Sequence, residues 1–171
     1  MTKEELKKEA GFDFENEKEC FEAVKHFNDA LKYIENQTPE LCMAAVCCDL
    51  NELNYVKNLT PELCMAAVKE NGFAITFVPE QFLTFELCKI ALENSEGDAI
   101  ECINPAYQTP ELCMMAVDLD PKNLHGIYPP NRTADICMAA VSKSAEALEF
   151  VRDQTIPIFV WQPLHKIKMK R

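Results

Sequence analysis

Nine cysteines are the side chains of this sequence with the clearest capacity for chemistry. Thiolates at regular spacing are typical of zinc sites and of disulfide frameworks. Six of them recur at intervals of 22, 22, 24, 25 and 24 residues, at Cys20, Cys42, Cys64, Cys88, Cys113 and Cys137. Equivalent residues on packed helices lie about 8–10 Å apart, whereas the sulfurs of one zinc site lie within about 4 Å of each other and the Cα atoms of a disulfide within about 7 Å. These register cysteines are therefore expected to be small core residues, with no metal and no cofactor.

The remaining chemistry-bearing residues predict no catalytic site. Cys47 stands where other copies of the repeat place polar residues, which predicts an exposed thiol, and no basic neighbour is placed to lower its pKa. His26, His125 and His165 lie in different parts of the chain without a metal-ligand spacing. Only four glycines occur and none belongs to a phosphate-binding loop. We expect a protein that is not an enzyme, with no catalytic, cofactor-binding or metal-binding residues.

A repeated segment positions the cysteines. Thr38–Val46 returns unchanged as Thr60–Val68. Thr is a favourable N-cap, Pro fits the first helical position, and the Glu that follows lies near the positive end of the helix dipole, so each segment predicts a short α-helix. Divergent copies begin at Thr84, Thr109 and Thr133, and a degenerate first copy covers Asn16–Val24.

Each copy also has a second half, represented by Leu31-Lys32-Tyr33-Ile34 and Leu53-Asn54-Tyr55-Val56. Its apolar pattern predicts a second, shorter amphipathic helix. A leucine-rich repeat of strands and helices has a similar period, but no asparagine ladder is present and segments such as Ala145–Leu148 favour helix.

The predicted fold is therefore all-α, an α-solenoid of about six helical-hairpin repeats of 22–25 residues with a C-terminal cap, forming a single domain over residues 1–171. Polar Glu19 and Glu22 suit an outward-facing first repeat, and the bulky segment Thr155–Trp161, closed by Pro163, suits a cap over the last. The expected repeats are 16–37, 38–59, 60–83, 84–108, 109–132 and 133–154, followed by the cap and a basic tail over 155–171.

The segment Ala67-Val68-Lys69-Glu70-Asn71-Gly72-Phe73-Ala74-Ile75-Thr76-Phe77-Val78-Pro79 resembles the repeat of an uncharacterised family of short tandem helical units found in bacterial and viral proteins. The resemblance covers about residues 16–154. It implies an all-helical array and no catalytic residues.

Two positions of the repeat differ in what they accept. The third residue after each register cysteine is always Ala, which predicts close approach of neighbouring helices. The residue directly after the cysteine is Met in most copies but Lys89 in one. Because lysine is almost never fully buried, this position is expected at the edge of the core, where flexible methionines can adapt to an apolar partner. The candidate partner-binding residues are Met43, Met65, Lys89, Met114 and Met138.

Charge narrows the class of partner. The net charge is −11, yet the last ten residues contain four basic groups and no acid, so the body before them is more acidic still. An acidic body repels nucleic-acid phosphates and attracts basic protein surfaces. The N-terminal segment has no apolar run, and free thiols suit a reducing compartment. We expect a cytoplasmic protein-interaction module with a basic protein partner, without direct nucleic-acid or membrane binding. Two alternatives stay open: an acidic viral or bacterial inhibitor of a host nucleic-acid-binding or defence protein, and a small-ligand-binding or enzymatic protein with a pocket between repeats.

Overall fold

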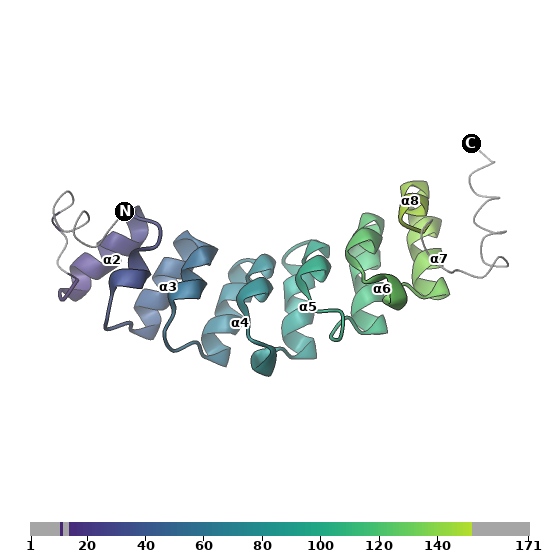
Figure 1. Ribbon diagram of the computed structural model, residues 1–171. Coiled ribbons are helices and arrows are strands. Elements are labelled where there is room, and N and C mark those ends of the chain that lie inside the picture. Colours follow the sequence, from purple (N-terminus) through teal and green to yellow (C-terminus); the bar gives the residue numbers. More distant parts are fainter. Residues whose placement is uncertain (1–10, 12–13, 152–171) are drawn as a thin grey trace. The chain divides into compact units, whose positions relative to one another are not determined.

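The fold is all-α. The computed structural model describes Gly11 and residues 14–151, and this part of the chain consists of helices and turns without a strand (Figure 1). The leucine-rich alternative, which requires a strand in every copy, is therefore wrong for the described residues. Among the helices of residues 14–151, none combines the length and apolar character needed to cross a bilayer.

The first half of each copy forms an α-helix of nine or ten residues, as predicted. Where the helix follows a threonine, the Thr hydroxyl accepts a hydrogen bond from the amide three residues later, as Thr38 does from Leu41 at 3.3 Å. This bond satisfies one of the amide groups that the first helical turn leaves open. The helices are α2 (Glu17–His26), α3 (Pro39–Cys48), α4 (Pro61–Glu70), α5 (Phe85–Glu93), α6 (Pro110–Leu119) and α7 (Ala134–Lys143).

The second half of each copy is a 3-10 helix, where the sequence predicted a short amphipathic helix without specifying its type. A polar side chain such as Asp49 or Asp120 accepts a hydrogen bond from the amide two residues later and so starts a tight turn. The 3-10 helices are short, as is usual for this form. A short α8 (Leu148–Val151) continues the last of them. The 3-10 helices are η2 (Ala30–Tyr33), η3 (Leu50–Tyr55), η4 (Gly72–Phe77), η6 (Asp98–Cys102), η7 (Pro121–Gly126) and η9 (Ala145–Ala147), with single turns at η5 (Glu80–Phe82) and η8 (Pro129–Asn131).

The described chain forms two compact units. The first contains the described residues up to Glu70 together with Phe77–Phe82, and the second contains Asn71–Thr76 and the described residues from Leu83 to Val151. In the first unit α2 packs on α3 and α3 on α4; in the second, α5 packs on α6 and α6 on α7. The expectation of one domain of six stacked repeats stays a prediction.

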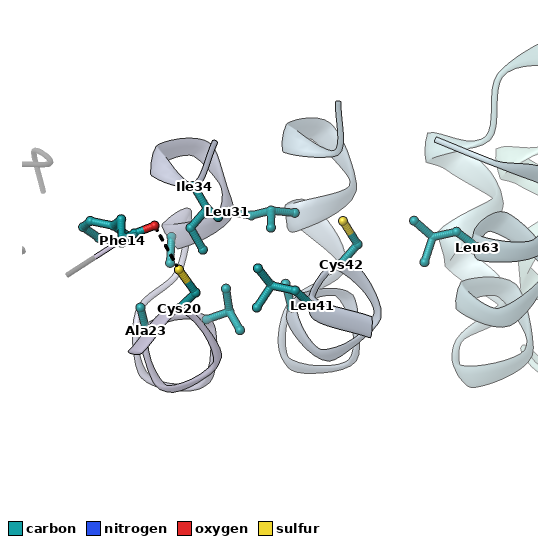
Figure 2. Close-up of a cluster of buried hydrophobic side chains, with 11 residues drawn as sticks. Phe14, Cys20, Ala23, Leu31, Ile34, Leu41, Cys42 and Leu63 are labelled. Atoms are coloured by element: carbon teal, nitrogen blue, oxygen red, sulfur yellow. Dashed lines mark hydrogen bonds between the residues drawn. The ribbon is translucent and has the colours of Figure 1, made fainter. Parts of the chain in front are cut away.

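The core of the first unit shows how one copy packs on the next (Figure 2). Leu31 of η2 and Ile34, the C-cap residue of η2, lie with Leu41 of α3 in one buried cluster. Cys20 is buried in the same cluster, and its thiol donates a hydrogen bond to the carbonyl of Phe14 at 3.3 Å. The register cysteine thus acts as a small core residue here.

The repeated Ala and Cys positions are buried in both units, as predicted. All six register cysteines are buried. The six alanines have no exposed surface at all: Ala23, Ala45, Ala67, Ala91, Ala116 and Ala140. A larger side chain at these positions would have to displace packed neighbours. Close approach also explains Gly72, where an added Cβ would lie 2.2 Å from the carbonyl oxygen of Ala91.

The predictions for the two ends have different outcomes. Glu19 is partly exposed and Glu22 is exposed, which agrees with a polar outward side on the first copy. The proposed cap Thr155–Trp161, Pro163 and the basic tail lie outside the described residues, so they stay predictions.

Candidate protein-binding surface

The predicted partner-binding residues lie at the edge of the core. Each directly follows a buried register cysteine and is itself partly buried, as the lysine at this position in the fourth copy led us to predict. The side chain of Lys89 is 41% exposed and forms a 3.9 Å ion pair with Glu93. In the first unit the position is occupied by Met43 on α3 and Met65 on α4, two helices that pack on each other. In the second unit it is occupied by Lys89, Met114 and Met138 on α5, α6 and α7. We call these five residues the methionine column.

An exposed acid accompanies each member of the methionine column, three residues earlier on the same helix. Residues three apart on an α-helix share a face, so each α-helix from α3 to α7 presents a carboxylate next to a half-buried apolar or aliphatic side chain. A carboxylate in the first turn also stabilises its own helix, by about 0.3–1 kcal/mol. The accompanying acids are Glu40, Glu62, Glu86, Glu111 and Asp135.

Helix α6 carries the most apolar version of this face. Met115 and Leu119 stand where α3 has Ala44 and Cys48. Together with three other side chains they line a shallow surface depression, and Leu119 is 45% exposed. We call this set the α6 patch: Glu111, Met114, Met115, Asp118 and Leu119. Comparison of the copies could have found the α6 patch, because three other copies carry alanine at the position of Met115.

Electrostatics around the α6 patch are acidic. Asp118 binds Lys143 of α7 at 2.6 Å, which offsets its charge. No ion pair forms at Glu111 within the part of the chain that the structure describes. The basic residues of copies four and five are engaged elsewhere: Lys89 with Glu93, Lys122 with Glu146 at 3.1 Å, and Arg132 with backbone carbonyls.

Polar side chains that link consecutive copies were missed by the sequence reasoning. Gln37 donates hydrogen bonds to the carbonyls of Leu31 in its own copy and Tyr55 in the next, both at 2.9 Å. Its carbonyl oxygen accepts the amide of Lys57 at 2.8 Å. One polar residue therefore satisfies the end of two successive 3-10 helices.

Two other residues perform the same role in the second unit. Gln108 donates to the carbonyls of Ile100 at 2.9 Å and Gly126 at 3.3 Å, and Arg132 donates to Ile127 and Phe150, both at 2.7 Å. The three residues share one position of the repeat, directly before the threonine N-cap: Gln37, Gln108 and Arg132. In the third and fourth copies the same position is apolar, at Leu59 and Leu83. That substitution of polar for apolar residues was the signal in the sequence.

Two buried polar residues replace alanine at a second position. Glu52 is 1% exposed and accepts the amides of Ala30 and Leu31, both at 3.1 Å. It thereby caps the preceding copy's 3-10 helix, whose N-cap Asp29 has a left-handed φ of 63° and makes no side-chain cap. Burial raises the pKa of the Glu52 carboxyl above its ordinary value, against the lowering effect of these backbone hydrogen bonds.

Asn123 occupies the equivalent position in the fifth copy. Its amide donates to the carbonyls of Glu96 at 2.8 Å and Ala116 at 3.0 Å. Gly97 makes room for it, because a Cβ there would lie 2.1 Å from the Asn123 amide nitrogen. Glu52 and Asn123 are thus used in the same way. The copy that precedes each of them has a left-handed residue, Asp29 or Gly97, at the start of its 3-10 helix, and Glu52 or Asn123 packs against that turn from the following copy.

The thiols differ in exposure: the register cysteines are buried, whereas Cys47 and Cys48 are exposed. Cys47 is exposed, as predicted, and its pKa is raised by desolvation and by the charges of Glu70 and Cys48, which disfavours the nucleophilic thiolate. Burial raises the pKa of Cys113 to about 11. The described residues contain no cluster of three or more metal-ligating side chains. Of the histidines, His26 lies 3.5 Å from Glu22, His125 lies 3.5 Å from Glu101, and His165 is outside the described residues.

Comparison with known proteins adds no further constraint. No protein-family model matches the chain, and no curated protein or solved structure shows significant similarity to it. The resemblance to the family of short tandem helical units stays a prediction.

Proposed function

We propose that this chain is a non-catalytic α-solenoid that binds a protein partner through the exposed face of its α-helices. Stacking of neighbouring copies within each unit is supported by the helix packing there and by the polar residues that bridge those copies. Such arrays present one repeated surface to a partner.

The observation that carries the proposal is the methionine column with its accompanying acids. Core positions elsewhere on the same helices are buried, but this position is partly exposed in every described copy. Methionine adapts its shape to different apolar surfaces, and the neighbouring carboxylates attract cationic groups. The partner we infer has a basic surface that also carries apolar side chains.

The chain itself supplies a variant for testing this. Lys89 occupies the column in the fourth copy without disturbing its helix, so lysine should be tolerated at the other members. We would replace Met43, Met65, Met114 and Met138 by lysine, which removes the apolar contact and repels a basic partner. The reciprocal Lys89→Met variant is the matched control.

The experiment compares proteins from cell extract that are retained by immobilised wild-type and variant chains, after circular dichroism has shown equal helix content. Proteins that bind through the column should be basic, be lost with the four-lysine variant and be retained with Lys89→Met. Retention of one unchanged set by all three chains would refute the proposal.

A second candidate function is that of an acidic inhibitor of a nucleic-acid-binding protein. Competition with DNA or RNA for a captured protein distinguishes this function from that of a general protein-binding module. That candidate is supported by the regular spacing of exposed carboxylates along successive α-helices. It requires that nucleic acid displace the chain from its partner.

A further inference from the structure

We infer that the α6 patch is the anchor point of the proposed surface and that it binds a basic amphipathic helix. The inference rests on the proposed function. It makes α6 the main site of contact with the partner, and the other members of the methionine column add to that contact.

The shape of the patch favours an apolar anchor. Met114 and Met115 lie beside Leu119 over the last two turns of α6, and their side chains line one depression. Equivalent positions on α3 and α4 carry alanine beside the column methionine, namely Ala44 and Ala66. A shallow apolar depression of this kind can receive a large side chain from one face of a helix, whose neighbouring anchors are typically spaced by three or four residues.

Charge complementarity defines the occupant. Copies four and five, residues 84–132, contain eight acidic and three basic residues. All three basic residues are engaged within the chain, as described above. The acidic groups at the patch, Glu111 before the methionines and Asp118 after them, can therefore receive lysine or arginine side chains that flank the apolar anchor. Asp118 would exchange its contact with Lys143, an exposed pair of small net stability.

An acidic helix would be repelled by the same carboxylates. A second copy of this chain is also disfavoured, because its exposed α-helix face carries the same acids and like charges would meet. The observations therefore select a cationic partner helix over both.

The test uses a synthetic helical peptide with leucine on one face and lysine on the other, and a counterpart in which every lysine is glutamate. Binding to the full chain is followed by fluorescence anisotropy. The patch variant combines Met115→Ala with Leu119→Asn, which are residues that other copies carry at these positions. The control is Ile90→Ala, a truncation to alanine at the position of α5 that is equivalent to Met115.

We expect the lysine peptide to bind wild type and the Ile90→Ala control alike, and to bind the patch variant at least tenfold more weakly, since two apolar anchors are lost. The glutamate peptide should not bind. Thermal denaturation of each variant separates loss of contact from loss of folding.

Several outcomes would overturn the inference. If the patch variant binds as wild type does while the four-lysine variant does not, the anchor lies elsewhere on the methionine column and the proposed function survives. If neither variant alters binding, the peptide uses another surface and both ideas fail. Equal binding of the two peptides refutes the charge argument, and absence of lysine-peptide binding to wild type refutes the assignment itself. Self-association that Met115→Ala and Leu119→Asn abolish would show that the occupant is a second copy.

Discussion

Replacing Glu52 by alanine should loosen the contact between the first two copies. Alanine is the residue that most copies carry at this position, for example Ala74 and Ala99, and both are fully buried. The substitution therefore introduces no steric clash. It removes the carboxylate that accepts the amides of Ala30 and Leu31.

The expected magnitude follows from the two amides. Ala30 and Leu31 have no exposed surface, so water cannot readily replace the lost acceptor. A buried donor left without a partner costs about 1–3 kcal/mol. Removing a buried charged group returns part of this through relief of desolvation, and the raised pKa of Glu52 shows that burial opposes its ionised form. We therefore expect a net decrease of about 2–4 kcal/mol in the free energy of unfolding.

Asn123→Ala provides the matched comparison at the equivalent position. Asn123 donates to two carbonyls instead of accepting from two amides, and its own side-chain oxygen has no hydrogen-bond partner among the described residues. Its loss should cost less, about 1 kcal/mol.

Urea denaturation gives the free energies, and native-state hydrogen exchange gives the location. Exchange of the Ala30 and Leu31 amides should accelerate in Glu52→Ala, while the amides of Ala147 and Leu148 in the second unit should keep their wild-type rates. Unchanged protection at Ala30 and Leu31 would refute the capping role, as would a loss in Asn123→Ala that matches or exceeds the loss in Glu52→Ala.

Four further predictions test the packing, the thiols, the titration and the charge. Ala67→Leu should destabilise the fold by about 1–3 kcal/mol, because Ala67 is 0% exposed and the packed stack cannot accept a larger side chain; a wild-type urea midpoint would contradict this. Brief labelling with a thiol reagent, read by mass spectrometry, should modify Cys47 in the folded state but Cys113 only after denaturation, since Cys113 is fully buried and its pKa is raised to about 11. Because the folded pKa of Glu52 lies above its ordinary 4.5, the stability linked to its protonation is present below that pH and is lost as pH rises through the folded pKa. The stability of wild type minus that of Glu52→Gln should therefore fall as the pH rises above 4.5, and a constant difference in urea titrations would refute this. Association with a basic partner, measured by stopped-flow kinetics, should slow as the salt concentration rises, since the Debye length falls from about 10 Å at 0.1 M to about 3 Å at 1 M. Deletion of Lys166–Arg171 should preserve or quicken binding. Loss of binding on deletion would instead assign the contact to the tail.

The features that the sequence alone determined are those that each copy repeats with local interactions. A threonine, a proline and an acid in succession start each of α3, α4 and α6, because capping and dipole effects act within one turn. Comparison of copies also predicted buried Ala67, buried Cys64, exposed Cys47 and the half-buried methionine column, since each copy solves the same packing problem.

The tertiary structure decided what depends on groups distant along the chain. Gln37 reaches the carbonyl of Tyr55, 18 residues away, and Glu52 reaches the amide of Ala30, 22 residues away. The period of the repeat places such residues near each other, but it does not predict which backbone amides and carbonyls lack a hydrogen-bond partner within their own copy. That depends on local turn geometry, such as the left-handed Asp29. The same limit applies to the α6 patch, where the identities of Met115 and Leu119 are visible in the sequence but their shared depression depends on how their side chains pack on α6.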